Sequence, residues 1–305
     1  MAHKIEFGLF SPLAGLGWKA VVERAAKIER LGYHSIWLTD HFWNRGVPEA
    51  EVLECTSAMS ALSVATEKLR IGSLVLCNSF RTPGLLAKVL ATIDNLSNGR
   101  VEIGLGAGWM EEEYRAYGYE FPSTATRLRR LDEGIQILKL LMTEKRSTFE
   151  GRYYRLTDAY CNPKPVQKPY PPITIGGSGE KLMLRIVARH ADRWNCPAGY
   201  RSFEHKLDVL KQHCQAVGRD IGQINISEQL LVCIGGNEAE VEEKWKIAQR
   251  LPFWRTGLKG TPPQIVQQLR ERVRKGITFF TIIFGDMNSD QSIDLFAREV
   301  KPAFA

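Results

Sequence analysis

An acidic residue and an imidazole follow directly on an apolar run in the stretch SIWLTDHFW, residues 35–43. The run predicts a buried strand whose exit delivers Asp40 and His41 to one place. Histidine has an unperturbed pKa near 6.5, so His41 suits the gain and loss of a proton near neutral pH. The pair therefore indicates acid–base chemistry at a strand end. A simpler interpretation stays open, in which His41 bonds a neighbouring loop and Asp40 caps the next segment.

A second strand exit carries glycine instead of charge. Residues 104–109 read GLGAGW, which does not match the G-x-G-x-x-G fingerprint of dinucleotide-binding folds. Glycine at a strand end lets a flat ring or a phosphate approach the backbone, and Trp109 would supply an apolar wall. Gly106, Ala107 and Gly108 are therefore candidate ligand contacts, although the glycines could also serve barrel curvature alone.

The most specific local pattern is ITIGGSGEKLMLRIVARHAD, residues 173–192. It predicts a strand, then a turn at Gly176, Gly177 and Ser178, then an amphipathic helix. Backbone amides and the positive end of the helix dipole would converge at this turn, which suits a phosphate group. No G-K-[ST] follows at the Walker spacing, so the pattern does not indicate ATP hydrolysis. A tight turn without a ligand is the alternative.

Several other chemistries lack the residues they need. The six histidines form no H-x-H or H-E-x-x-H pattern, so the sequence does not indicate a metal site of the hydrolase type. The chain has no G-x-S-x-G elbow, and no lysine stands at a predicted strand exit for a Schiff base. The chemistry is therefore expected to belong to a bound cofactor.

Composition and charge narrow the class of protein. The 41 Lys and Arg residues exceed the 34 Asp and Glu residues, but they are dispersed, which favours small anionic ligands over nucleic acid. The six cysteines show no C-x-x-C spacing and indicate reduced core residues. The sequence has no signal-peptide pattern and no run of roughly 18 or more apolar residues. We therefore expect a soluble, cytoplasmic protein without a membrane partner.

The elements that must position these residues are eight short apolar runs, rich in β-branched and aromatic residues. They span residues 4–10, 35–40, 70–76, 101–108, 173–177, 192–198, 224–235 and 279–285. Helical periodicities lie between them, and the runs have little polar alternation, as is typical of parallel strands covered on both faces. The pattern predicts an α/β fold of the (β/α)8 TIM-barrel type in a single domain over residues 1–305. An open doubly wound sheet is the alternative.

Two stretches are longer than a usual connection between a strand and a helix, about 143–172 and about 250–262. In the first, STFEG and RYYRLTD predict a small hairpin around Gly151. We expect both stretches to be insertions in the barrel. Elsewhere Gly32 and Gly276 stand where the periodicity of a helix stops, and they are expected to end those helices.

Six motifs, in order along the chain, resemble the luciferase-like monooxygenase superfamily and most closely its coenzyme F420-dependent oxidoreductase branch. They are TDHF (39–42), SFRTPGLLAK (79–88), NGRVEIGLGAGWMEEEYRAYG (98–118), RLRRLDEGIQILK (127–139), NPKPVQKPYPPITIGGSG (162–179) and ADRWN (191–195). The resemblance implies a bacterial luciferase-like (β/α)8 barrel that binds the deazaflavin F420, or alternatively flavin mononucleotide (FMN), at the carboxyl ends of its strands. It also implies a homodimer, which is common in the superfamily.

The resemblance assigns roles to residues as well. His41 would lie beside the reactive ring as the catalytic acid or base, and the peptide between Leu74 and Val75 would be cis and support the ring from behind. The oligoglutamate tail of F420 could meet Arg81, Arg127 or Lys181. The predicted cofactor contacts are Asp40, Leu74, Val75, Gly106, Ala107, Gly108, Gly176, Gly177 and Ser178, the last three at the phosphate.

The implied reaction is hydride transfer to an activated C=C or C=N bond, or from an alcohol, with His41 handling the proton. The sugar-phosphate dehydrogenases of the branch place a glutamate where this chain has Trp109, so a phosphorylated sugar is not the expected substrate. Trp43, Trp109 and Trp254 are expected to line a pocket for a small, fairly apolar organic substrate. The alternatives are an FMN-dependent monooxygenase served by a partner flavin reductase, and a noncatalytic flavin-binding protein.

Overall fold

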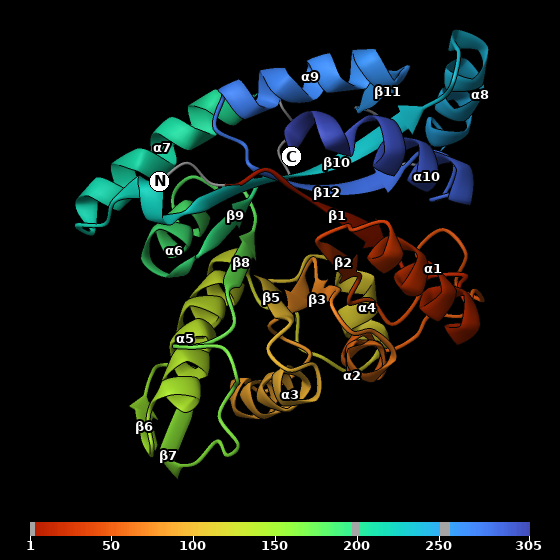
Figure 1. The fold of residues 1–305 in the computed structure, drawn as a ribbon. Coiled ribbons are helices and arrows are strands. Elements are labelled where there is room, and N and C mark those ends of the chain that lie inside the picture. Colours follow the sequence, from red (N-terminus) through yellow and green to blue (C-terminus); the bar gives the residue numbers. More distant parts are fainter. Residues whose placement is uncertain (1–3, 197–201, 251–256) are drawn as a thin grey trace.

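Eight parallel strands close into a barrel in the computed structural model, which describes residues 4–196, 202–250 and 257–305 (Figure 1). Around the ring they are β1 (Glu6–Ser11), β2 (Ser35–Leu38), β3 (Arg70–Ser73) with its continuation β4 (Leu76–Cys77), β5 (Val101–Gly106), β8 (Ile173–Gly176), β9 (Arg193–Asn195), β10 (Asn225–Ile234) and β12 (Phe279–Phe284). Because β12 pairs with both β10 and β1, the ladder returns to its start. The predicted (β/α)8 barrel is confirmed, and the open doubly wound sheet is excluded.

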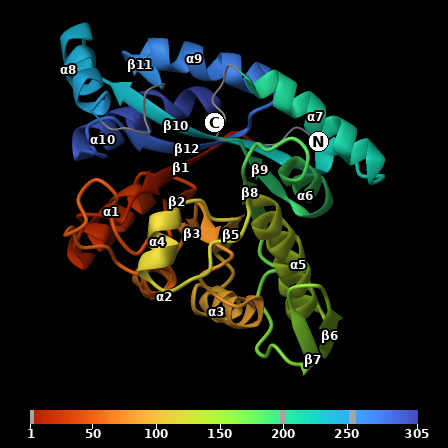
Figure 2. The same cartoon turned by 180° about the vertical axis from the view of Figure 1, so that it is seen from behind.

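A helix follows each barrel strand, and Figures 1 and 2 show these helices on all sides of the sheet. They are α1 (Trp18–Arg30), α2 (Cys55–Ala65), α3 (Pro83–Leu96), α4 (Glu111–Ala116), α5 (Thr124–Thr143), α6 (Met183–His190), α7 (Phe203–Ala216), α8 (Glu238–Ala248), α9 (Pro262–Arg274) and α10 (Asp290–Glu299). Gly32 and Gly276 end α1 and α9 as predicted, with φ of 67° and 94°, a backbone conformation that favours glycine. Within the described ranges, no helix is long and apolar enough to span a bilayer.

The strands read as apolar runs because both of their faces are covered. All six residues of β5 and all six of β12 are buried. Inside the barrel the indole of Trp37 lies against two glycines: a Cβ atom at Gly8 would come within 2.8 Å of Trp37 Nε1, and one at Gly72 within 2.9 Å of its ring. The ring of Phe279 packs edge-on against Trp37 at 5.9 Å. Side chains therefore fill the amino-terminal half of the barrel.

The first of the two long stretches forms the predicted hairpin. Strands β6 (Ser147–Glu150) and β7 (Arg155–Ala159) pair antiparallel and form a separate two-stranded sheet around Gly151. In the second stretch, residues 251–256 lie outside the described ranges. The short strand β11 (Leu258–Gly260) then adds parallel to β10, outside the barrel ring, and Thr261 caps α9. The hairpin and β11 thus lie outside the ring of barrel strands.

Candidate active site

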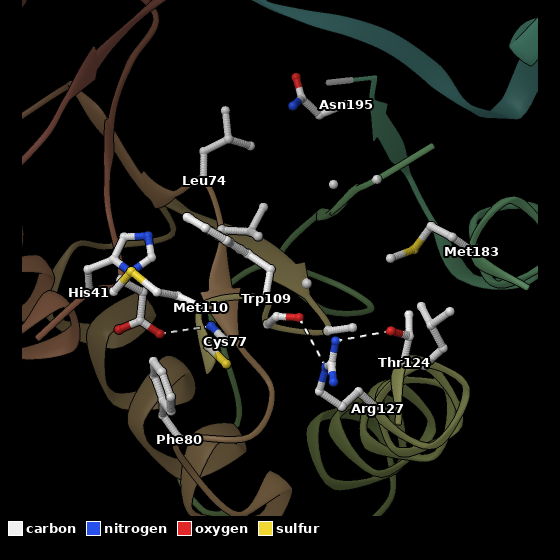
Figure 3. A pocket seen from close by; sticks show the side chains of 18 of the residues that line it. His41, Leu74, Cys77, Phe80, Trp109, Met110, Thr124, Arg127, Met183 and Asn195 are labelled. Atoms are coloured by element: carbon white, nitrogen blue, oxygen red, sulfur yellow. Dashed lines mark hydrogen bonds between the residues drawn. The ribbon is translucent and has the colours of Figure 1, made fainter. Parts of the chain in front are cut away.

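A cavity of about 590 Å³ opens at the carboxyl ends of the barrel strands (Figure 3). Its size lies within the range of small-molecule and cofactor sites. The predicted site residues that line it are Asp40, His41, Leu74, Val75, Gly106, Ala107, Gly108, Trp109, Gly176, Gly177 and Ser178. Residues from four strand exits, far apart in the sequence, are therefore brought to one place by the closure of the barrel.

His41 is held by a buried carboxylate at the rim of this cavity. Its Nδ1 atom lies 2.9 Å from Glu113 Oε2, and the Glu113 side chain is only 1% exposed. The other Glu113 oxygen accepts the backbone N–H of Phe42 at 2.5 Å, which fixes the carboxylate in turn. Because a carboxylate accepts hydrogen bonds, it favours the tautomer with the proton on Nδ1. No described residue bonds Nε2, so this atom can exchange a proton with a ligand.

Asp40 lines the cavity, but other protein groups already engage its oxygens. Arg81 donates to both of them, at 2.8 and 2.9 Å, and the backbone N–H of Cys77 donates to one at 2.8 Å. Arg81 also pairs with Glu54. Burial opposes the charged form of Glu54, yet hydrogen bonds from Ser57, Arg81 and the Thr56 backbone outweigh it and lower the pKa of Glu54 to about 2. Two carboxylates thus neutralise Arg81, so it is not available for an oligoglutamate tail.

The peptide between Leu74 and Val75 is cis, as the resemblance implies. It separates β3 from β4 and places Val75 against two of the predicted glycines. A Cβ atom at Gly106 would lie 2.5 Å from Val75 Cγ2, and one at Gly176 would lie 3.1 Å from Val75 Cγ1. These glycines are therefore required for the close packing of Val75, which gives the cavity a wall of backbone and small apolar groups.

Gly108 has a different reason for being glycine. Its φ is 77°, and an added Cβ atom would lie 1.8 Å from the Tyr114 hydroxyl oxygen. That hydroxyl donates to the carbonyl oxygen of Ala107 at 3.2 Å and lies 3.0 Å from Cys77 Sγ. Burial is the main cause of the raised pKa of Cys77, about 11, so the thiol stays protonated near neutral pH. Tyr114 therefore holds the loop after β5 in place.

The turn after β8 differs in part from the prediction. The helix α6 begins at Met183, four residues after Gly179, so its amino end does not follow the glycines directly. Gly177 has a φ of 145°, and its N–H donates to the carbonyl oxygen of Asn195 at 3.2 Å. The N–H groups of Ser178 and Gly179 meet no acceptor among the described residues. An anion at this turn would therefore be bound by these N–H groups and not by the amino end of an adjoining helix.

A buried guanidinium faces the same part of the cavity. Arg127, at the start of α5, is 6% exposed, and its Nε and Nη2 atoms donate to Gly108 O and Thr124 Oγ1, each at 3.2 Å (Figure 3). It also bonds the Pro122 carbonyl and lies 3.9 Å above the Phe121 ring. All of these partners are neutral, and no carboxylate in the described ranges pairs with Arg127. A buried cation of this kind attracts an anionic group of a ligand.

The three predicted tryptophans have different places. Trp109 is 52% exposed at the cavity, and its ring lies edge-on to His41 at 5.9 Å. Trp43 does not line the cavity, because the chain turns away after Phe42, whose ring packs between Phe80 and Tyr117 at 4.6 Å from each. Trp254 lies outside the described residues. Of the two tryptophans that the structure describes, Trp109 lies at the cavity, where it can touch a substrate, and Trp43 does not.

A sequence model of the family described as luciferase-like monooxygenase matches residues 5–275. The chain belongs to this family. Among its relatives, the F420-dependent glucose-6-phosphate dehydrogenase of Kineococcus radiotolerans is 30% identical over 252 residues, which are 78% of this chain and 72% of that protein. The FMNH2-dependent dimethylsulfone monooxygenase of Pseudomonas putida is 27% identical over 288 residues, which are 82% of this chain and 78% of that protein.

Solved structures agree on the luciferase-like fold. An F420-dependent secondary alcohol dehydrogenase in complex with an F420–acetone adduct superposes with a TM-score of 0.83 at 20% identity, over 99% of both chains. The predicted superfamily is confirmed, as is the prediction that the chain is an enzyme of this class.

Four residues that line this cavity have no local sequence signal for their place in it. Glu113 stands in the run EEE (111–113), which looks like a solvated charge cluster until the helix α4 turns its third member inward. The resemblance links Arg127 only to the oligoglutamate tail of F420, whereas the structure has it at the cavity. Asn195 and Gln229 line the cavity as well, and only the motif ADRWN drew attention to the first. Strand register, which the sequence does not reveal, decides which residues of β9 and β10 face inward.

Proposed function

We propose that this chain is an oxidoreductase that uses the deazaflavin coenzyme F420 for hydride transfer to or from a small, fairly apolar organic substrate at the carboxyl-terminal face of the barrel. The observation that carries the proposal is the arrangement of the cavity. It holds a histidine whose Nε2 has no partner among the described residues, and it also holds Arg127 and the backbone N–H groups of Ser178 and Gly179, which meet no acceptor in those ranges. A ligand with a reactive ring and a phosphate complements these groups.

The residues present fit such a cofactor. The glycines beside Val75 give a wall that a planar ring can approach closely, and a phosphate would accept hydrogen bonds from Arg127, Ser178 and Gly179. When bound, the deazaflavin supplies the carbon that gains or gives up the hydride. The names of relatives support this choice, since both the dehydrogenase of Kineococcus radiotolerans and the alcohol dehydrogenase of the same fold are F420-dependent.

His41 handles the proton in this proposal. As an alcohol substrate is oxidised, Nε2 accepts its hydroxyl proton, and in the reverse direction the same atom returns it. Glu113 keeps Nδ1 protonated and stabilises the imidazolium that forms, as a carboxylate does beside a catalytic histidine. Trp109 supplies an apolar surface next to His41 and carries no charge that would select a phosphorylated sugar.

Calorimetric titration of the purified protein with F420 and with FMN tests the proposal. We expect F420 to bind more tightly, and we expect a secondary alcohol or a conjugated alkene to change the absorption spectrum of the bound cofactor. If neither cofactor binds, the proposal is wrong.

An FMN-dependent monooxygenase is the second candidate, because the monooxygenase of Pseudomonas putida is a relative of similar coverage. Preferential binding of FMN in the titration would favour it, together with oxygen-dependent turnover when a flavin reductase is added. Homodimer formation is proposed on the superfamily resemblance alone, and sedimentation of the purified protein at several concentrations tests it.

A further inference from the structure

Two amide side chains lie in the cavity on the side away from Arg127. Asn195 ends β9, and Figure 3 shows it across the cavity from Arg127. Gln229 lies in β10, two residues beyond Ser227, which pairs with Asn195 in the sheet register. Since alternate residues of a strand share a face, Ser227 and Gln229 both face the barrel interior beside Asn195. The two amides thus belong to one patch, on neighbouring strands.

These amides have hydrogen-bonding capacity that the protein does not use. Asn195 is only 3% exposed, and its Oδ1 accepts from Ser227 Oγ at 3.3 Å. Its Nδ2 donates to no described residue, and the Gln229 amide bonds no side chain or backbone group in the described ranges. Each amide can donate two hydrogen bonds and accept two. The patch therefore offers both donors and acceptors to whatever fills the cavity.

The patch is neutral, and three of the ionisable residues that line the cavity are already paired. Arg81 compensates Asp40, and His41 is paired with Glu113. A phosphate or carboxylate would find its cation at Arg127 instead. What an Asn and a Gln side chain recognise well is a planar edge that itself both donates and accepts, as amides, lactams and imides do.

We propose that Asn195 and Gln229 form an amide-recognition subsite, which binds a neutral ligand edge that carries both N–H and C=O groups. Two ligands could bring this edge: the pyrimidinedione part of the cofactor ring, or an amide or imide group of the substrate. The first source rests on the proposed function and the second does not. In either case the subsite selects by hydrogen bonding, so it rejects a purely hydrocarbon ligand of the same shape.

The variants N195L and Q229L test the subsite, because leucine keeps a similar volume and removes every donor and acceptor. The matched control is Q291L, which removes an exposed glutamine of α10 far along the chain from both strands. Calorimetry measures the dissociation constants of F420, FMN and uracil, a small imide probe, with uracil added both to the free protein and to the protein loaded with its cofactor. Thermal melts confirm that each variant is folded, and N195D replaces N195L if the leucine variant is not.

We expect N195L and Q229L each to weaken binding of the edge by about threefold to tenfold, the effect of one or two lost hydrogen bonds, while Q291L has no effect. If the variants bind the cofactor more weakly, and uracil competes with the cofactor in the wild type, the cofactor ring brings the edge that the subsite binds. If the cofactor-loaded variants bind uracil more weakly than the cofactor-loaded wild type does, the substrate brings this edge. If the wild type binds neither cofactor but binds uracil through these residues, the proposed function fails and the subsite stands. If both variants bind all three ligands as the wild type does, the subsite is refuted.

Discussion

The two halves of the barrel interior contrast in how they treat polar groups. In the amino-terminal half, Glu102 is 1% exposed and pairs with Arg70 at 2.6 Å and with Arg193 at 2.8 Å. The Arg193 guanidinium also lies 4.0 Å above the Phe279 ring. These charges pair within the protein, and neither Glu102 nor Arg193 lines the cavity at the carboxyl ends of the strands.

In the carboxyl-terminal half, several polar groups have hydrogen-bonding capacity that the described residues do not use. Nε2 of His41, the guanidinium of Arg127 and the amides of Asn195 and Gln229 all line the cavity with bonding capacity left over. One end of the barrel interior thus holds buried pairs that connect its strands, and the other end holds polar groups that are available to the ligand proposed above. Substitutions in the two halves should therefore have opposite consequences.

The largest effect is expected for His41→Ala. We expect turnover to fall about 10²- to 10⁴-fold, since the group that transfers the proton is lost. The free energy of unfolding should fall by less than in Glu102→Ala below, because His41 is 32% exposed and Glu113 keeps the backbone N–H of Phe42 as a donor. Turnover is measured by the absorbance of F420, with the secondary alcohol or conjugated alkene that the wild type converts fastest. His205→Ala, at a side chain 65% exposed on α7, is the control. Unchanged turnover in His41→Ala would leave this histidine without a catalytic role.

Glu102→Ala should have the reverse effect. The substitution leaves Arg193 buried without its partner, which we expect to lower the free energy of unfolding by about 3 to 5 kcal/mol. Urea denaturation measures this loss, and cofactor binding by the folded fraction should persist. The control Glu112→Ala removes an exposed partner of Arg45 and should lower the free energy of unfolding far less than Glu102→Ala does. If the free energy of unfolding fell equally in the two variants, the buried pairs of the amino-terminal half would contribute no more to stability than an exposed pair does.

The amino-terminal half should also make stability depend on pH through His34. Burial, with contributions from nearby arginines, lowers the pKa of His34 from 6.5 to about 4 in the folded protein. The unfolded chain therefore binds a proton between pH 6.5 and pH 4 that the folded chain does not. This contribution to stability is present above pH 6.5 and is lost as the pH falls toward 4, by roughly 3 kcal/mol at most.

Denaturation of the wild type and of His34→Gln at pH 7 and pH 4 measures the contribution of His34 to the pH dependence of stability. The difference between the two pH values should be smaller in the variant, because glutamine does not titrate. A difference of the same size in both proteins would mean that His34 does not contribute to the pH dependence.

The smallest of these effects is expected for Arg127→Met, a substitution in the carboxyl-terminal half that should weaken cofactor binding. Loss of a charge-assisted bond to phosphate should weaken binding of F420 and FMN about 10- to 100-fold. Riboflavin, which has the ring of FMN without its phosphate, should bind the variant and the wild type equally. Arg129→Met, an exposed neighbour on α5, is the control. Equal weakening for riboflavin would show that Arg127 acts on the shape of the cavity instead of on the phosphate.

The sequence was most informative where burial alone specifies structure. Parallel strands covered on both faces must be apolar throughout, so eight such runs between helical periodicities predicted the barrel, which the structure confirms. The hairpin around Gly151 and the helix ends at Gly32 and Gly276 followed from local turn chemistry in the same way. The position of Asp40 and His41 after an apolar run predicted that they lie at the carboxyl end of a strand, and the structure has them there, beside the cavity.

Tertiary structure alone decided which polar residues are partners and which are free. Asp40 seemed available to a cofactor until folding brought Arg81 to it, 41 positions along the chain. Nothing in the local sequence links Glu113 to His41, which lies 72 positions earlier in the chain, and only folding makes them partners. Such pairings depend on strand register and helix rotation across the barrel, and no local pattern records them. The chain thus encodes the architecture in its hydrophobic periodicity, whereas the chemistry of the cavity arises only when distant strand ends meet.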